Sequence, residues 1–526
     1  MAATNRAKGA TKTPGWAARG KLRLAHVPGG PAEAARLVYA GLWDKTPAGL
    51  LSANRYGAEL VAELVAKKIN AVVLTWSPGF SLEGDVPQWE LVASLLPALK
   101  KKKIRAIADL SLTGCFAAEL LPRVAEAKSW LERQADGKPV SHRNDTCLQM
   151  NVHHEGWRQY LAHKVRMAAG AGFDGFYFSD IYAVETEAAG FLTWLREIAH
   201  SARPPEADEM LFFCGSSLPA LIAAGNLKWV DALAKPAIDT EHSGANLIAL
   251  KPCFELGGRD LGFVCGIAEG ASEKEARVAA AEVLATGGAC HGLRVPAAYQ
   301  NFLAENGDLF GSADPVSSVA LLVDGDAASL AELRSDSALA LLLRHGIQFD
   351  VIPVGQLRSF DLKKYRVLIG THLRTATPAT SEALSTFASQ FGGTLLQATS
   401  PDAPRSEEEK GKGRILHHGM PLSAEGATAW LADVQRFAGE QPIEVESPAG
   451  LIALLWGKGT KRWVHFINYA SKPCDATVAL PGCGGRTLAA HSPDEPAPQL
   501  TVIETGTANA KFTLKGIQTY TIVEVN

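Results

Sequence analysis

The sequence predicts an α/β protein in three parts: a (β/α)8 TIM barrel at residues 21–312, a small flavodoxin-like α/β domain at 313–440 and a β-sandwich at 441–526. In the first part, short apolar runs alternate with amphipathic stretches, which is typical of parallel strands covered by helices. Alternating strands and helices that continue over about 290 residues suit a closed barrel better than an open sheet. The alternation restarts in the second part, and the third contains short strands separated by turns rich in Gly, Pro and Asn.

The composition is that of a globular protein of several domains. A chain of 526 residues is too long for one core, and its hydrophobic and charged fractions, 47% and 20%, are ordinary. The net charge of -3 argues against a nucleic-acid partner, since binding many phosphates needs an excess of Lys and Arg. No apolar run approaches the length of about 20 residues that crosses a membrane. Residues 1–20, rich in Ala, Thr, Lys and Gly, are expected to form a disordered leader.

The cysteines bear on the cellular compartment. The eight cysteines are scattered and include no CxxC pair, so they form neither a metal-ligand set nor a disulfide framework. This favours the cytoplasm and leaves a periplasmic or secreted location open. If the protein is exported, Cys474 and Cys483 are candidates for a disulfide. No metal and no cofactor are predicted.

The predicted barrel strands determine where the active site lies. In a barrel of this kind the site lies at the carboxyl ends of the strands, in the loops that follow them. The polar side chains directly after each apolar run are therefore the candidates. Strands are expected at residues 38–43, 71–76, 104–109, 175–178, 211–214, 237–240, 261–265 and 292–295, and the first helices at 58–68 and 89–103.

Aromatic and carboxylate side chains gather at these strand ends. Sugars bind through stacking on aromatic rings and hydrogen bonds to carboxylates, so the mixture predicts a carbohydrate ligand. Residues 151–155 lack the i, i+4 histidines of a zinc helix, and we interpret them as the loop before the next helix, with one His lining the pocket. His242 has the alternative of a packed loop histidine. The expected substrate-binding residues are Trp43, Trp76, Asp109, His153, Tyr177, His242 and His291.

Two carboxylates are the expected catalytic groups, because glycoside hydrolysis needs an acid and a nucleophile or base beside the scissile bond. Asp180 ends the aromatic strand at 175–178, where its carboxylate would point into the barrel mouth. Its alternative role is the N-cap of the next helix. Glu241 is the second candidate and Glu255 its rival, and each has the alternative of a solvated loop carboxylate.

The second and third parts show no catalytic signature. No Cys lies between residues 315 and 400 to act as the nucleophile of a glutamine-amidotransferase-like domain, so this domain is expected to be structural. The charge-rich stretch 400–412 is interpreted as a surface loop. The second part is expected to contain strands at 319–323, 349–352 and 366–369 and helices at 338–345 and 381–390, and the third part strands at 451–456, 462–467 and 519–523.

Three local segments carry a resemblance to a known group. Residues 130–139, with their Asp136-Gly137-Lys138-Pro139 loop, are followed by residues 147–151 and by the strand at 172–180. This series resembles glycosyl hydrolase barrels related to family 42 β-galactosidases and family 29 α-fucosidases. Residues 285–288 are similar to the A-x-G-G turn of these proteins. The second part resembles the trimerisation domain of family 42, which implies a homo-oligomer, and specifically a trimer.

The resemblance implies a glycoside hydrolase that acts on an oligosaccharide or glycoside. In retaining α-glycosidases of this kind the carboxylate of the fourth strand is the nucleophile. Here Ser179 occupies the usual Asp position and Asp180 follows it. The Asn-Glu dipeptide of family 42 is absent from this strand, so β-galactosidase activity itself is not predicted. The alternative is a non-catalytic carbohydrate-binding barrel that has lost its carboxylate pair.

Overall fold

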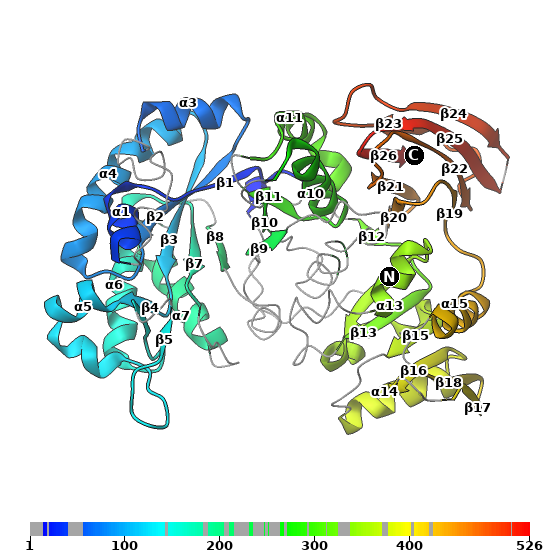
Figure 1. Ribbon diagram of the computed structural model, residues 1–526, viewed down its shortest axis with the longest axis horizontal. Coiled ribbons are helices and arrows are strands. Elements are labelled where there is room, and N and C mark those ends of the chain that lie inside the picture. The colour runs from blue at the N-terminus through cyan, green and yellow to red at the C-terminus, as the bar shows by residue number, and fades with distance from the viewer. Residues whose placement is uncertain are drawn as a thin grey trace.

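The described residues form five sheets. They are an eight-stranded parallel sheet, a six-stranded sheet, two antiparallel sheets of five and four strands, and a small three-stranded sheet. Figure 1 shows the parallel sheet and its helices on one side of the molecule and the six-stranded and antiparallel sheets on the other. The computed structural model describes residues 14–17, 20–39, 56–142, 146–181, 188–204, 210–214, 231–234, 247, 251, 264–267, 271–291, 294–311, 313–323, 337–370, 377–400, 404–419, 424–506 and 508–526.

The parallel sheet has the strand order β8-β7-β3-β2-β1-β11-β10-β9. Neighbouring strands follow their order in the chain and β1 pairs with the last strand, β11, which is the order of a (β/α) barrel. Among the described residues, the end strands β8 and β9 do not pair. The strands are β1 Leu24–Val27, β2 Ala71–Ser77, β3 Arg105–Ser111, β7 Gly175–Ser179, β8 Leu211–Cys214, β9 Asp231–Ala234, β10 Val264–Ile267 and β11 Ala289–His291.

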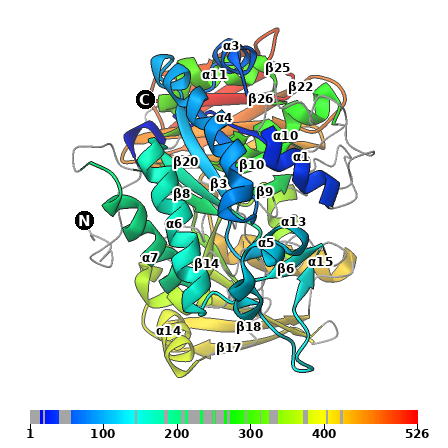
Figure 2. The ribbon, with the colours of Figure 1, turned by 90° about the vertical axis from the view of Figure 1, so that its left-hand side faces the viewer.

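The two faces of this sheet have different neighbours, because side chains alternate along each strand. The outer face, including Val72, Leu74 and Phe176, shares one apolar core with the helices. The inner face, including Val73 and Tyr177, forms a separate core. Figure 2 shows α4, α6 and α7 in front of the strands. The helices that accompany the sheet are α1 Gly30–Tyr39, α3 Ala58–Ala66, α4 Leu82–Lys101, α6 Glu155–Ala171, α7 Ala188–Ser201, α10 Glu273–Ala285 and α11 Ala297–Asn306.

The end of the predicted leader packs against the inner face. Gly15–Ala17 form a short 3-10 helix, η1, and Ala17 is buried in the same core as Leu22 and Leu24. The guanidinium carbon of Arg105 lies 5.7 Å from the centre of the Trp16 ring. This part of the leader is therefore folded against the sheet and does not extend away from it.

A long excursion separates β3 from α6. It lies beyond the carboxyl end of β3 and contains an antiparallel sheet with the order β4-β6-β5. Its elements are β4 Gly114–Phe116, α5 Ala117–Arg123, η4 Ala125–Trp130, β5 Ser141–His142 and β6 Cys147–Gln149.

The predicted strands at 71–76, 104–109, 175–178 and 211–214 are confirmed, but the first predicted strand, at 38–43, is wrong at residues 38 and 39, and residues 40–43 lie outside the described residues. Residues 38 and 39 are the last turn of α1, and the first strand is β1. A short apolar run at the end of a helix cannot be distinguished from a strand by periodicity. The last strands, β10 and β11, lie about three residues from their predicted positions. The strand predicted at 237–240 lies outside the described residues.

The six-stranded sheet has the order β14-β13-β15-β16-β18-β17 and is parallel except for the β17–β18 pair. The loop predicted at 400–412 is wrong, because residues 406–410 form the edge strand β17. Charged residues are common on edge strands, where they oppose pairing with another chain, and they resemble a loop in sequence. The elements are β13 Val319–Val323, α13 Ser337–Arg344, β14 Phe349–Pro353, β15 Val367–Gly370, α14 Pro378–Ser389, β16 Thr394–Ser400, β17 Ser406–Lys410, β18 Gly413–Gly419 and α15 Ala424–Ala438, with the 3-10 turns η6 Val354–Ser359 and η7 Leu362–Lys364.

The two antiparallel sheets lie at the carboxyl end of the chain. Their orders are β12-β20-β21-β26-β23 and β19-β22-β25-β24, and residues of both, such as Val464 and Phe512, share one apolar core. The strands are β12 Asp314–Pro315, β19 Glu444–Glu446, β20 Leu451–Lys458, β21 Lys461–Asn468, β22 Cys474–Pro481, β23 Leu488–His491, β24 Gln499–Thr505, β25 Asn509–Ile517 and β26 Tyr520–Val525. Cys474 and Cys483 are buried free thiols, not a disulfide.

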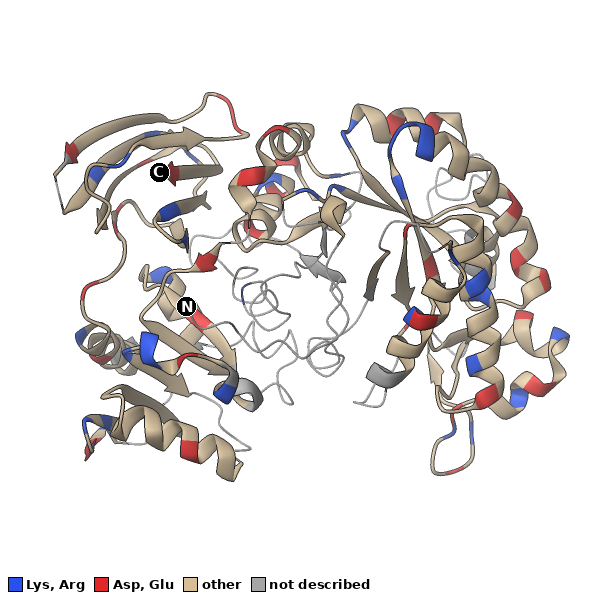
Figure 3. Ribbon diagram, turned by 180° about the vertical axis from the view of Figure 1, so that it is seen from behind, with Lys and Arg blue, Asp and Glu red and all other residues tan. Residues whose placement is uncertain are grey.

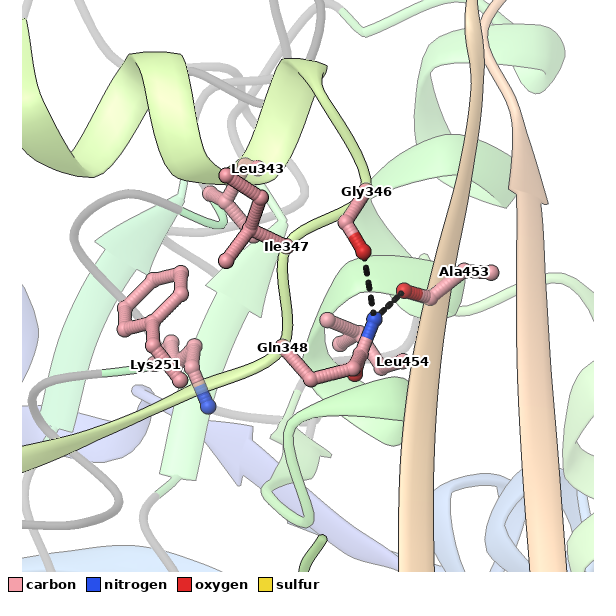
Figure 4. A pocket seen from close by; sticks show the side chains of 8 residues that line it. Lys251, Leu343, Gly346, Ile347, Gln348, Ala453 and Leu454 are labelled. Carbon is pink, nitrogen blue, oxygen red and sulfur yellow. Dashed lines mark hydrogen bonds between the residues drawn. The ribbon is translucent and has the colours of Figure 1, made fainter. Parts of the chain in front are cut away.

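Buried side chains join the six-stranded sheet to the antiparallel sheets. Figure 4 shows Gln348 of the loop before β14 beside Ala453 of β20. The Gln348 amide donates to the carbonyls of Gly346 and Ala453 at 3.3 and 3.0 Å and accepts from the Leu455 amide at 2.9 Å. The ammonium group of Lys251 lies 4.8 Å from the centre of the Phe349 ring. Within the described residues, the space between these side chains is too small to admit even one water molecule.

Helix α10 joins the parallel sheet to the antiparallel sheets. The Tyr469 hydroxyl donates to the Glu282 carboxylate at 2.6 Å, and the Trp456 indole donates to the Ala285 carbonyl at 3.0 Å. Both Glu282 and Tyr469 are buried. Burial, together with the nearby Glu282 carboxylate, raises the pKa of Tyr469 well above its usual value, so the hydroxyl keeps its proton.

Removal of this hydroxyl is expected to destabilise the protein. The Tyr469→Phe variant should lose about 1–3 kcal/mol, because the buried Glu282 carboxylate loses a charge-assisted hydrogen bond. Urea unfolding followed by tryptophan fluorescence measures the change. In a Glu282→Gln background the same substitution should cost less. An equal cost in both backgrounds would mean that the hydrogen bond is not the cause.

Among the described residues, no helix is long and apolar enough to span a bilayer. Basic and acidic residues are interspersed along the described ribbon in Figure 3. This mixture agrees with the small net charge of the chain and gives no support to a nucleic-acid surface.

Candidate active site at the carboxyl ends of the strands

Four inner-face side chains meet near the carboxyl ends of β1, β2, β3 and β7. Asp109 of β3 is in register with Thr75 of β2 and with Tyr177 of β7, so the three lie side by side. His26 of β1 completes the group. Its Nε2 lies 3.4 Å from Asp109 Oδ2, and its ring meets the Tyr177 ring edge to face at a centroid distance of 5.3 Å.

Two polar atoms of this group have no hydrogen-bond partner within the part of the chain that the structure describes. Asp109 Oδ1 and Thr75 Oγ1 are buried and have no hydrogen-bond partner there. The side chains of Asp109 and His26 nevertheless keep 15% and 24% of their surface exposed. A buried acceptor without a donor is costly, so its presence beside a partly open surface is typical of a site completed by a ligand. Sugar hydroxyls are suitable donors.

Asp180 stands directly beyond the end of β7, which ends at Ser179. Its φ of 51° is left-handed, so the strict alternation of strand side chains no longer applies to it. The Asp180 carbonyl accepts from the Thr113 amide at 3.3 Å and the Thr113 hydroxyl at 2.7 Å. A Cβ on Gly114 would lie 3.1 Å from the Asp180 Cβ, so this glycine gives Asp180 its space. An N-cap residue has an extended backbone, so the left-handed φ of Asp180 does not fit the alternative role as the N-cap of the next helix.

Two predicted ligands, Asp109 and Tyr177, lie in the inner-face group, and Trp76 does not. Trp76 follows the inward-facing Thr75 and therefore points to the outer face. It is only 2% exposed, and it stacks on Trp89 of α4 at 5.3 Å and meets Phe173 edge to face at 5.1 Å. The prediction of Trp76 as a substrate-binding residue is wrong, because adjacent strand residues face opposite sides.

The other predicted residues are only partly described. His153 lies on an exposed turn before α6, where its amide donates to Asn151 Oδ1 at 2.8 Å, so the predicted loop before this helix is confirmed. His291 ends β11 in register with Leu24, but its side chain is outside the described part of the structure. Trp43, Glu241, His242 and Glu255 lie outside the described residues.

The sequence did not reveal His26. Strand β1 has only four residues and its apolar run is interrupted by this histidine, so it was not recognised as a strand. The available signal for His26 was its place as a polar residue, second from the end of a short apolar run that precedes Gly29-Gly30.

A second polar cluster lies near the end of β2 but is closed to solvent. The ammonium group of Lys164 in α6 contacts Asp85 Oδ2 and Ser77 Oγ, each at 2.8 Å, and also the Phe80 carbonyl. Asp85 and Lys164 are 0% and 1% exposed. Burial raises the pKa of Asp85, and the ammonium group of Lys164 opposes this rise. The cluster joins the first turn of α4 to α6 and has no open surface for a substrate.

No group of three or more His, Cys, Asp or Glu side chains in the described residues could hold a metal ion.

Solved structures provide the comparison. The chain superposes on α-L-fucosidase isoenzyme 2 from Paenibacillus thiaminolyticus with a TM-score of 0.67 and 13% identity, over 96% of this chain and 99% of that chain. A β-galactosidase from Bacillus circulans sp. alkalophilus gives 0.66 and 11%, over 96% and 99%. A GH42 β-galactosidase from G. stearothermophilus gives 0.61 and 12%, over 96% and 98%. These are glycosidase folds.

The fold resemblance to α-fucosidases and family 42 β-galactosidases extends over nearly the whole chain. It agrees with the resemblance predicted from residues 130–139, 147–151 and 172–180. No family model and no curated protein sequence matches the chain. At 11–13% identity the comparison shows the fold, and the chemistry has to be argued from the side chains.

Proposed function

We propose that this protein is a glycoside hydrolase that acts on an oligosaccharide or glycoside bound at the carboxyl ends of the parallel strands. The single observation that carries the proposal is the inner-face group around His26, Asp109 and Tyr177, near the carboxyl ends of the strands of a glycosidase fold. In such a fold these strand ends are where substrates bind. The sheet is proposed to close into a barrel between β8 and β9.

The proposed roles follow from the chemistry of each side chain. Asp180 acts as nucleophile or base and Glu241 as general acid, with Glu255 as the alternative to Glu241. The Asp109 carboxylate and the His26 imidazole bind sugar hydroxyls, and the Tyr177 ring provides an aromatic surface. His153, His242, His291 and Trp43 are further candidates for contact with the sugar.

A screen of aryl glycosides tests the activity. The set includes an α-L-fucoside and a β-D-galactoside, since these are the sugars in the names of the similar structures. At least one member should be hydrolysed in a saturable way. No hydrolysis of any member, combined with saturable sugar binding, would contradict the proposal and favour a carbohydrate-binding barrel.

Asp109 is expected to contribute mainly to binding. The Asp109→Asn variant should raise KM about tenfold and change kcat less, because its carboxylate loses charge-assisted hydrogen bonds to the sugar. Asp136→Asn is the matched control, since Asp136 lies on an exposed hairpin and pairs with Lys138. An unchanged KM in Asp109→Asn would remove this residue from the site.

We also propose the three-part division at residues 21–312, 313–440 and 441–526, with the middle part mediating assembly into a homo-oligomer, specifically a trimer. Light scattering of the purified full chain measures the mass. A monomer at micromolar concentration would contradict the assembly proposal without affecting the proposed activity.

A further inference from the structure

A cavity with two arginines lies where α10 and α11 begin. Its volume is about 450 Å³, and its lining includes Arg277, Arg294, Glu273 and several alanines. These helices follow β10 and β11, so the cavity lies on the side of the sheet where the parallel strands end. Small-molecule sites commonly have volumes of 300–1,000 Å³. The cavity therefore has room for more than a single inorganic ion.

Arg277 has hydrogen-bond donors that are not used within the described residues. Its Nη2 contacts Glu273 Oε1 at 2.6 Å, but its Nη1 lies 3.8 Å from Asp494 Oδ1, beyond hydrogen-bond distance. Its buried Nε has no partner within the described residues. Asp494 Oδ2 accepts from the Thr519 and Tyr520 amides at 3.0 and 2.7 Å, so this carboxylate already has other donors. A guanidinium with open donors is suited to bind an oxyanion through two parallel hydrogen bonds.

The Glu273 carboxylate is a weak competitor for Arg277. Its side chain is 74% exposed, and the pair is an i, i+4 contact on the surface of α10. Such exposed pairs contribute little in water and are easily exchanged. A ligand anion in the cavity can therefore replace Glu273 as the partner of Arg277.

The opposite wall provides further positive potential. Arg294 is exposed and lies shortly before α11, and Ala297 and Ala298 of the first turn of α11 also line the cavity. The N-cap of α11 is Pro296, which makes no side-chain cap hydrogen bond. The first turn of a helix attracts anions through its amide groups and its dipole. Loops after the seventh and eighth strands, with a helix start, are also where (β/α) barrels frequently bind phosphate.

We propose that this cavity binds a tetrahedral oxyanion, the phosphate or sulfate group of a small phosphorylated or sulfated ligand. Two guanidinium groups offer more donors than the two oxygens of a carboxylate can accept, whereas phosphate and sulfate offer three or four oxygens. The site is independent of the proposed glycosidase activity, because none of its residues belongs to the inner-face group.

Calorimetry with the full chain in phosphate-free buffer tests the site. The probes are inorganic phosphate, sulfate, acetate, galactose 6-phosphate and galactose. Phosphate and sulfate should bind in a saturable way with a Kd of about 1 mM or tighter, galactose 6-phosphate more tightly, and acetate and galactose at least about tenfold more weakly. Absence of saturable phosphate and sulfate binding, or acetate binding as tight as that of phosphate, would overturn the proposal.

Three variants locate the binding. Arg294→Gln, at an exposed position that should not affect folding, and Arg277→Gln should each weaken phosphate binding about tenfold or more, and Glu273→Gln should strengthen it, because the competing carboxylate is gone. Arg358→Gln is the control, since this exposed arginine pairs with Glu382 in another part of the chain. Wild-type affinity in both Arg294→Gln and Glu273→Gln would overturn the site. Hydrolysis is not measured, so this result stands apart from the outcome of the glycoside screen.

Discussion

The Asp180→Asn variant is expected to lose about 10²- to 10⁴-fold in kcat on the aryl glycoside that the wild-type protein hydrolyses best. The substitution removes the negative charge and the capacity to take up a proton, and it keeps the size of the side chain. Asparagine tolerates a left-handed φ better than most residues, so it can adopt the φ of 51° found here. The two hydrogen bonds from Thr113 reach the Asp180 backbone carbonyl and are retained.

The melting temperature should therefore change by no more than about 2 °C, which differential scanning calorimetry measures together with the kinetics. Asp136→Asn is again the matched control, because it removes an exposed carboxylate from the hairpin of the excursion between β3 and α6. If Asp180→Asn hydrolyses the substrate at the wild-type rate, Asp180 is not a catalytic residue. A large fall in melting temperature would identify it as a structural residue instead.

The Lys164→Met variant is expected to lose about 3–5 kcal/mol of folding free energy. The substitution leaves the buried Asp85 of α4 without its cation, and it also removes the donor to Ser77 and to the Phe80 carbonyl. A buried carboxylate without a partner costs far more than an exposed ion pair contributes. Urea unfolding followed by circular dichroism measures the loss.

Lys67→Met provides the surface comparison for this variant. Lys67 pairs with Glu63 across one turn of α3, and both side chains are at least one-third exposed, so its loss should cost less than about 1 kcal/mol. Adding Asp85→Asn to Lys164→Met should restore part of the stability, because the uncompensated charge is removed. A loss below about 1 kcal/mol in Lys164→Met would show that water reaches Asp85.

The sequence predicted those residues of the candidate site that lie at the ends of recognisable strands. Asp109 and Tyr177 were found because each lies at or near the end of a long apolar run, and their inward direction follows from strand periodicity. The prediction for Trp76 is wrong because it rests on the position of the strand end alone. The side chains of β2 alternate between the two faces, and this alternation directs Trp76 to the outer face. His26 was missed because β1 is short and polar in its third position.

Contacts between distant residues could not be predicted from one sequence. Asp85 and Lys164 are 79 positions apart, and nothing in either local segment indicates their pairing. Strand β17 is charged along its length, and its identity as a strand comes from its antiparallel partner β18. In both cases the tertiary partner decides the structure and local preference does not.

The packing of helix α10 against two sets of sheets has a consequence for the cooperativity of unfolding. One side of this helix packs on β10 and β11, and the other meets β21 and β26 through contacts that include Tyr469 and Glu282. A truncated chain that ends before residue 441 would expose the second side of α10, including a buried carboxylate, to water. The parallel sheet and the antiparallel sheets should therefore melt as one calorimetric unit, and proteolysis between them should release no stable fragment that contains α10.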